Sequence, residues 1–210
     1  MIKGIIFDLD GTILNSKELR VEAWKHAFDT FGINLTWNDI SPLIGIPGPD
    51  LAGKFSRKAF EIEMEEERYF RANLDRLKLY DDVHSTFELL GNNNIKTAIV
   101  TSSRRALLDI LKLPYKPVVT IDDVEVGKPD PESYLKALAT LGVSPGDSMV
   151  VGDAETDLIP AREIGAVSVL IGHGSVSLSE FADYYVDEIA EVGHLAMKLN
   201  KTRGNGEIVL

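Results

Sequence analysis

Short apolar runs with strand character alternate with helical stretches along most of this chain. The runs that we expect to form strands begin with Ile5–Phe7 and continue with Ile95–Thr101, Pro117–Ile121, Ser148–Val151 and Ala166–Ile171. One helical stretch precedes each of the four later runs, at Val83–Leu90, Ala106–Leu111, Glu132–Leu141 and Leu158–Ile164. Such alternation is typical of a mainly parallel sheet with helices on both faces and right-handed crossovers, so it predicts a doubly wound α/β fold.

One long stretch, residues 16–80, interrupts this alternation. Apolar residues recur in it at helical spacing, at Leu19, Ala23, Trp24, Ala27, Phe28 and Phe31. Ser16 is a suitable N-cap for this helix, and a charged helix is expected near Lys58–Leu77. The segment Pro42–Asp50 between them is so rich in Pro and Gly that we expect no regular structure there. We therefore expect a Rossmann-like core, residues 1–15 and 81–210, with an inserted helical cap, residues 16–80, placed as a lid would be.

The composition excludes several classes of protein. A length of 210 residues and a hydrophobic content of 44% allow a substantial core, and the lack of cysteine rules out disulfides and thiolate chemistry. A net charge of −11 without a basic stripe argues against nucleic acid or an anionic membrane as a partner. No apolar run approaches a membrane span, and Met1 leads into a strand rather than a cleavable signal. We expect a cytoplasmic monomer or homodimer; the tail, residues 201–210, is either disordered or an added edge strand.

Two carboxylates one residue apart, Asp8 and Asp10, stand where the first strand ends. Ligand sites of open α/β sheets lie at the carboxyl ends of strands, so these acids are candidates for catalysis. An ionised Asp8 can attack phosphorus and form an aspartyl phosphate. Asp10 can deliver a proton to the leaving alkoxide, for which we expect burial and the neighbouring acid to raise its pKa. Gly11 allows a sharp turn that brings backbone amides to a phosphate.

A second acid pair, Asp153 and Asp157, follows a later strand. Mg²⁺ prefers carboxylates, carbonyls and retained waters, which Asp8, the carbonyl of Asp10 and Asp153 would supply. Asp157, four residues on, suits a supporting role, holding a metal-bound water or Lys128. The alternative for Asp157 is an acid at a helix N-terminus that interacts only with the helix dipole.

Hydroxyl and ammonium groups complete the pattern. Thr101 ends a strand, and its hydroxyl with the amide of Ser102 could bind phosphate; alternatively, Ser102 or Ser103 simply caps the next helix. Lys128 lies in a turn stiffened by Pro129 and Pro131, where its ammonium can act as a point charge against phosphate and the nucleophile.

In order and spacing these parts resemble the motifs of the haloacid dehalogenase superfamily of phosphohydrolases. Asp8 to Thr12 matches its first motif, Thr101 its second, Lys128 its third, and Gly152-Asp153 with Asp157 its fourth. The resemblance covers nearly the whole chain, and the insert after the first motif is similar to the helical cap of a subgroup that includes phosphoglycolate phosphatase and β-phosphoglucomutase. It implies Mg²⁺ as cofactor and a small phosphorylated metabolite as substrate.

Departures from the subgroup pattern argue against a mutase. The loop Ile44–Pro49 lacks the arginine that grips a distal phosphate in sugar-phosphate mutases, and Arg20 stands where mutases tend to have histidine. Asn15 replaces an aspartate that is common before the cap. The dehalogenase enzymes of the superfamily lack an aspartate at the position of Asp10, so the presence of Asp10 argues for phosphate chemistry. Arg20, Lys54 and Arg57 are the residues that we expect to contact the far end of the substrate.

The sequence therefore predicts a Mg²⁺-dependent phosphatase that hydrolyses a small phosphate monoester through an aspartyl phosphate. Two other functions stay open: a sugar-phosphate mutase of the same superfamily, and a phospho-acceptor signalling module of the receiver type. The long insert and the late acid pair argue against the receiver, and the full set of acids argues against an inactive relative that only binds.

Overall fold

A computed structural model describes residues 1–173 and 179–204, which contain a parallel sheet of six strands in the order β3-β2-β1-β4-β5-β6. The strands are β1 (Gly4–Asp8), β2 (Lys96–Val100), β3 (Val118–Val119), β4 (Ser148–Gly152), β5 (Val167–Ile171) and β6 (Tyr184–Val186). Every ladder is parallel, which confirms the predicted doubly wound sheet. The strand order reverses direction between β1 and β4, and ligands of open α/β sheets bind at such a switch point.

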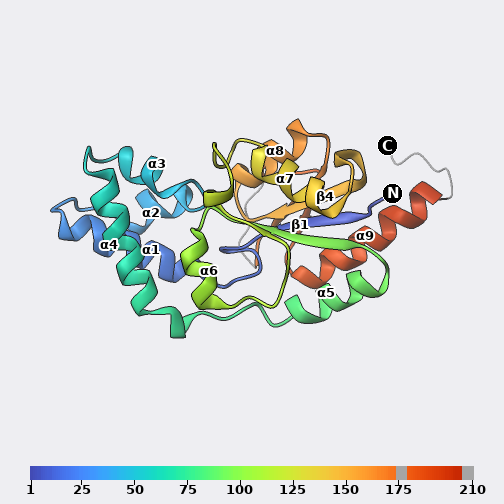
Figure 1. Cartoon of the computed structure of the whole chain (residues 1–210), viewed down its shortest axis with the longest axis horizontal. Helices are drawn as coiled ribbons and strands as arrows, with labels where there is room; N and C mark the ends of the chain where they lie inside the picture. Colours follow the sequence, from blue (N-terminus) through green and yellow to red (C-terminus); the bar gives the residue numbers. More distant parts are fainter. Residues whose placement is uncertain (174–178, 205–210) are drawn as a thin grey trace.

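Helices cover both faces of the sheet (Figure 1). They are α5 (Val83–Asn92), α6 (Arg105–Leu111), α7 (Glu132–Leu141), α8 (Glu155–Glu163) and α9 (Ile189–Gly204), with short 3-10 turns η3 (Ile121–Asp123) and η4 (Pro145–Asp147). Because side chains of a strand alternate between faces, Ile5 and Phe7 of β1 join the cluster under α5 and α9. Ile6 points the other way and packs with Tyr134 and Leu138 of α7.

The insert forms a helical cap beyond the carboxyl ends of the strands (Figure 1). It contains α1 (Lys17–Thr30), α2 (Trp37–Ile40), η1 (Ser41–Leu43), α3 (Gly48–Gly53), α4 (Ala59–Ala72) and η2 (Leu74–Arg76). Trp24, Phe28, Ile40, Leu51 and Ile62 are buried together in an apolar cluster that includes no residue of the sheet. The cap thus has its own small core, as a separately packed unit requires.

The two chain segments that join cap and sheet run side by side. Leu14 and Leu79 form an antiparallel bridge, and the amide of Asn15 donates to the carbonyl of Lys78 at 2.9 Å. The amide of Tyr80 donates to the carbonyl of Ile13 at 3.2 Å. The predicted domain boundaries at 15/16 and 80/81 lie within these paired segments, and they stay a prediction.

One local prediction about the cap is wrong, and another holds for the position of the residue but not for its hydrogen bond. The Pro- and Gly-rich segment contains regular structure, because α3 begins at Gly48 with Pro49 in its first turn, where the missing N–H of proline costs no helical hydrogen bond. Ser16 is the N-cap residue of α1, as predicted, but its side chain makes no capping hydrogen bond; its hydroxyl instead donates to Asp10 Oδ1 at 2.7 Å.

The end of the chain differs from expectation as well. Strand β6 and helix α9 were not predicted, and α9 includes the first four residues of the tail. Residues 205–210, where the choice between disorder and an edge strand was open, lie outside the described residues.

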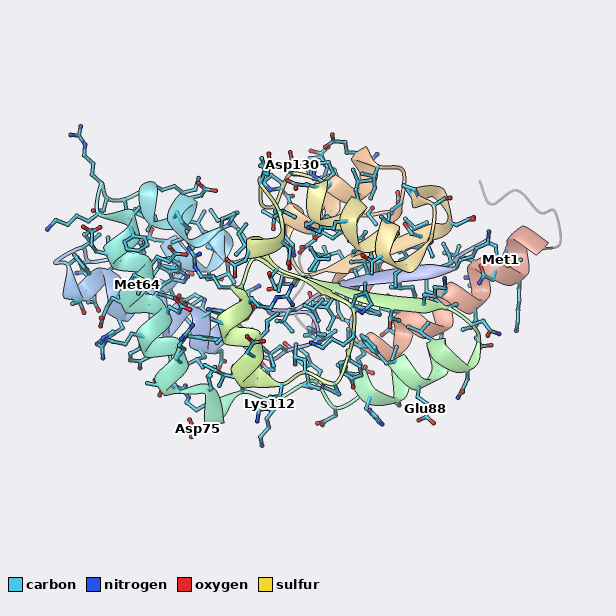
Figure 2. The ribbon with its side chains drawn as sticks, viewed as in Figure 1. Met1, Met64, Asp75, Glu88, Lys112 and Asp130 are labelled. Carbon is cyan, nitrogen blue, oxygen red and sulfur yellow. The ribbon has the colours of Figure 1, made fainter. Side chains whose placement is uncertain are left out.

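The surface agrees with the acidic composition. The charged side chains labelled in Figure 2, such as Glu88, Lys112 and Asp75, lie at the periphery and are exposed. Within the described ranges there is no helix both long and apolar enough to cross a membrane.

Candidate active site

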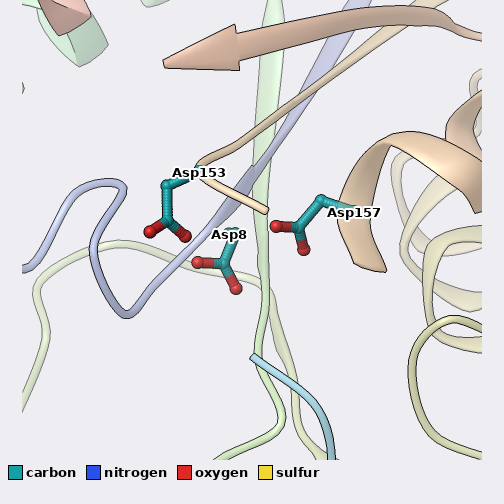
Figure 3. A group of neighbouring side chains, drawn as sticks. All are labelled: Asp8, Asp153 and Asp157. Atoms are coloured by element: carbon teal, nitrogen blue, oxygen red, sulfur yellow. The ribbon is translucent and has the colours of Figure 1, made fainter. Parts of the chain in front are cut away.

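Three aspartates meet at the switch point of the sheet (Figure 3). Asp8 is the last residue of β1, Asp153 follows β4, and Asp157 lies in the first turn of α8. One carboxylate oxygen from each lies within 4.8 Å of the others. Since β1 and β4 are neighbours, residues 145 positions apart in sequence are brought together by strand pairing alone.

The donor set of these aspartates fits Mg²⁺. Carboxylate oxygens are the ligands that this ion prefers. Asp157 Oδ2 is buried and has no hydrogen-bond partner among the described residues, so it can accept from a metal-bound water. Gly152 leaves space for this carboxylate, because a Cβ at that position would lie 2.3 Å from Asp157 Oδ2.

Lys128 forms hydrogen bonds with two of the aspartates, Asp8 and Asp157. Its Nζ donates to Asp8 Oδ1 at 2.5 Å, to Asp157 Oδ1 at 2.7 Å and to the carbonyl of Val100 at 3.3 Å. The hydroxyl of Tyr134 also donates to Asp157 Oδ1, at 2.7 Å. Burial lowers the pKa of Lys128, but Asp157 and Asp8 outweigh burial and raise that pKa well above its usual value. The ammonium is therefore charged and held at Asp8.

The crowding of acids affects their protonation. Burial, together with Asp157 and Asp153, raises the pKa of Asp8 well above its usual value, although Lys128 opposes the shift. Burial raises the pKa of Asp153 to about 6, although the ammonium of Lys17 lies 3.1 Å from its Oδ2. A divalent cation among these carboxylates would favour their ionised forms.

Asp10 is held by a cationic partner that the sequence did not suggest. Arg20 Nε donates to Asp10 Oδ1 at 3.1 Å, and the hydroxyls of Ser16 and Ser103 donate to the same carboxylate at 2.7 and 2.9 Å. Burial alone would raise the pKa of Asp10, but the charge of Arg20 and these hydrogen bonds hold it below its usual value. The expectation that the pKa of Asp10 is raised is therefore wrong for this arrangement.

The predicted phosphate-binding residues Thr101 and Ser102 lie beside Asp8, whereas the amide of Gly11 already has another hydrogen-bond partner. Thr101 and Ser102 line the same cavity as Asp8. The Thr101 hydroxyl accepts from the amide of Ser103, and the Ser102 hydroxyl donates to the carbonyl of Gly45 in the cap at 2.8 Å. Helix α6 begins only at Arg105, so neither serine caps it. Gly11 makes the expected turn at φ +82°, but its amide donates to the carbonyl of Leu14, which argues against this amide as a phosphate donor.

A cavity of about 70 Å³ lies between the sheet and the cap. Asp8, Asp10, Thr101 and Ser102 line its core side. Of the three basic residues expected at the far end of the substrate, only Arg20 lines this cavity, and it contacts Asp10 directly. Lys54 lines a separate groove that reaches Lys128, and Arg57 is exposed.

Several residues of the site were missed from sequence. On the cap side the cavity is lined by Glu63, Glu66 and Glu67 of α4, and on the core side by Ser103 and Arg104. The signal for the glutamates was available, because positions three and four apart share one face of a helix. Lys17, three residues before Arg20 in α1, carried a similar signal.

Comparison with known proteins gives the same superfamily. A family model described as haloacid dehalogenase-like hydrolase matches residues 5–171. The pyrophosphatase PpaX of Bacillus cereus is 31% identical over 218 residues, covering 96% of this chain and 99% of the relative.

Solved structures agree in fold. A hydrolase from Pseudomonas syringae has a TM-score of 0.84 at 29% identity and covers 94% of this chain and 99% of its own. A β-phosphoglucomutase from Clostridium difficile has a TM-score of 0.83 at 20% identity, with 97% and 99% covered, and is a likeness of fold alone.

Proposed function

Because this chain belongs to the haloacid dehalogenase-like hydrolases, we propose that it is a Mg²⁺-dependent phosphatase of small phosphate monoesters. The observation that carries the proposal is the position of Lys128, whose ammonium is bonded to both Asp8 and Asp157 within the group of three aspartates. A charged lysine at a buried carboxylate orients the nucleophile and attracts a phosphate to it.

Each chemical step has a residue suited to it. The Asp8 carboxylate attacks phosphorus as the ester P–O bond breaks, and Asp10 in its protonated form gives a proton to the departing alkoxide. Because Arg20 favours the ionised form of Asp10 in the arrangement described above, this step requires that bound substrate weaken the contact between Asp10 and Arg20. Water then attacks the aspartyl phosphate at phosphorus while Asp10 takes up its proton, which releases phosphate and restores Asp8. Lys128, the Thr101 hydroxyl and the Ser102 amide hold the phosphoryl oxygens during both steps.

The aspartates also explain the metal requirement that we propose. Asp8, Asp153 and the carbonyl of Asp10 would hold Mg²⁺, with Asp157 accepting from one of its waters. The bound ion supplies positive charge that offsets repulsion between the phosphate and the acids.

The cap suits the role of a lid. The Ser102 hydroxyl and the cap carbonyl of Gly45 are 2.8 Å apart, so the cap touches the phosphate-binding loop directly. We propose that residues 16–80 open to admit substrate and close to exclude bulk water.

One second candidate function has a specific observation in its favour. The relative at 31% identity is named a pyrophosphatase, so inorganic pyrophosphate is a candidate substrate of this chain as well. The mutase and receiver alternatives are supported only by the general resemblance between the acids of this site and the acids of those proteins.

Turnover of p-nitrophenyl phosphate tests the proposal. We expect multiple turnovers with Mg²⁺, no turnover in EDTA, and recovery on adding Mg²⁺ back, while Asp8→Asn abolishes turnover and keeps the folded circular dichroism spectrum. Activity that persists in EDTA, or in Asp8→Asn, would contradict the metal or the nucleophile. Uptake of one phosphate per chain without turnover would instead indicate a receiver.

A further inference from the structure

The cap side of the catalytic cavity carries more carboxylates than cations. Away from Asp8, its charged lining residues are the acids Asp10, Glu63, Glu66 and Glu67 and the bases Arg20 and Arg104. The leaving group of a substrate bound at Asp8 meets these side chains, because they form the charged part of the cavity wall. Their charges therefore select the leaving group.

Arg20 contacts two acids and can balance the charge of only one. Its Nε donates to Asp10 at 3.1 Å and its Nη1 to Glu66 Oε1 at 3.1 Å, while Nη2 donates to the hydroxyl of Ser103 at 2.6 Å. Its guanidinium also lies 3.5 Å over the ring of Phe70, which fixes its plane. All three of its nitrogens are thus in use, and one negative charge of the Asp10–Glu66 pair remains unbalanced whenever both carboxyl groups are ionised.

Glu66, one of the two acids that contact Arg20, has a carboxylate oxygen without a hydrogen-bond donor among the described residues. Glu66 is only 3% exposed. Its Oε2 receives no hydrogen bond from any residue in the ranges 1–173 and 179–204. This oxygen is not one of the unpaired side-chain atoms of these ranges that are completely buried, so it keeps some accessible surface. Glu66 lines the catalytic cavity, so a ligand in that cavity can reach an unpaired oxygen of this side chain. A buried carboxylate oxygen that faces a cavity without a donor is satisfied best by a donor on the ligand.

Neither arginine that lines the cavity in the described part of the chain offers a free guanidinium to a second anionic group. The other arginine of the cavity, Arg104, donates through Nη2 to both oxygens of Glu63 and through Nη1 to Asp122. A second phosphate or a carboxylate on the substrate would therefore meet paired arginines and an unpaired glutamate, which is unfavourable for pyrophosphate and for phosphoglycolate.

Within the phosphatase function proposed above, we propose that the substrate is the phosphate monoester of a short amino alcohol, whose ammonium group donates to Glu66 Oε2. Asp10, which serves the ester oxygen, and Glu66 are bonded to the same guanidinium and therefore lie close together, so we expect a short carbon chain to link the ester oxygen to an ammonium group at Glu66. Trp24 lines the same cavity, and an aromatic ring is a favourable neighbour for an ammonium group. The cavity volume of about 70 Å³ also favours a small leaving group.

A matched set of three phosphate monoesters, together with the phosphoanhydride pyrophosphate, tests this assignment. 2-Aminoethyl phosphate, propyl phosphate, phosphoglycolate and pyrophosphate differ mainly in the charge that faces Glu66. We expect kcat/KM for 2-aminoethyl phosphate to exceed that for propyl phosphate, and phosphoglycolate and pyrophosphate to fall below both. In Glu66→Gln the ratio of kcat/KM for 2-aminoethyl over propyl phosphate should drop about 10-fold to 100-fold, since a charged hydrogen bond is lost.

The control is Glu65→Gln, because Glu65 is the adjacent acid of α4, pairs with Arg68 and His26, and does not line the cavity. It should leave the ratio as in the unmodified protein. A ratio that is unchanged in Glu66→Gln, or a preference for phosphoglycolate or pyrophosphate, overturns the ammonium assignment while the phosphatase function stands. Absence of turnover with every ester, p-nitrophenyl phosphate included, overturns the phosphatase function itself.

Discussion

Glu66 shows how strongly one buried side chain can depend on its surroundings. Burial raises its pKa to about 7, although the charge of Arg20 opposes the shift. Its neighbour Glu65 stays near solvent, and hydrogen bonds from Arg68 lower its pKa. Two glutamates adjacent in sequence therefore have opposite shifts, because one faces the cavity and the other faces water.

The raised pKa of Glu66 predicts a pH-dependent cost in stability. Below pH 4.5 the acid is protonated in both the folded and unfolded states; between pH 4.5 and about 7 only the folded state keeps the proton. The free energy of unfolding therefore falls across this window, by on the order of 3 kcal/mol at about 1.4 kcal/mol per pKa unit. Glu66→Gln removes this loss, so its stability relative to the unmodified protein should rise from pH 5 to pH 8.

Urea unfolding in EDTA at several pH values measures this difference. Glu65→Gln is the control, because the pKa of Glu65 is lowered in the folded protein. The stability of this variant relative to the unmodified protein should therefore not rise between pH 5 and pH 8. Parallel stability curves for Glu66→Gln and the unmodified protein would mean that Glu66 ionises as an ordinary glutamate.

At the scale of elements, the site depends on how a strand passes into the next helix. Strand β4 ends at Gly152, and α8 begins at Glu155 after a turn that carries Asp153. The first turn of α8 holds Asp157 against the end of β4, where Lys128 and Tyr134 bond to its Oδ1. This connection leaves room for the Asp157 carboxylate only because Gly152 has no Cβ.

Gly152→Ala should therefore displace Asp157 without removing any functional group. The new Cβ would lie 2.3 Å from Asp157 Oδ2, so the carboxylate or the helix has to move. A shift of about 1 Å in such a site can cost 100-fold in rate, and we expect a loss of that order in kcat/KM, with weaker Mg²⁺ binding by calorimetry.

Gly146→Ala is the matched control, because a Cβ at this nearby glycine of η4 meets nothing within 4 Å. Circular dichroism shows whether each variant is folded. Equal kcat/KM for a folded Gly152→Ala and its control would rule out the tight packing at Asp157.

The whole molecule adds a long-range field to these local contacts. The formal net charge is −11, and the acids of the cavity share its sign. A phosphate ester that carries two negative charges is repelled as it approaches, whereas Lys128 and the Mg²⁺ that we propose would reverse the sign locally.

Salt should therefore speed capture of anionic substrates. With Mg²⁺ saturating, raising NaCl from about 20 to about 200 mM shortens the Debye length and should increase kcat/KM for propyl phosphate a few-fold, with little change in kcat. The rise should be smaller for 2-aminoethyl phosphate, whose ammonium offsets part of its charge. A decrease of kcat/KM with salt for both esters would show that the field at the cavity mouth is attractive.

Much of the fold was predictable because it rests on local patterns. The strands around β1 and β4 are short apolar runs with clear limits, and the helix Glu132–Leu141 has the same bounds in structure as in prediction. Strand β6 was missed since it is only three residues long, and α3 was missed because helix-starting prolines resemble loop prolines. Length and local composition could not separate these cases.

The sequence by itself determined which acids stand at strand ends, because parallel strands bring their carboxyl ends to one edge wherever they pair. Only the tertiary structure decided the partners of those acids. Arg20 meets Glu66 across 46 residues and Lys128 meets Asp8 across 120, and both contacts depend on the packing of the cap and the order of the strands. The lowered pKa of Asp10 and the unpaired oxygen of Glu66 follow from that packing, since charge and burial act through space and not along the chain.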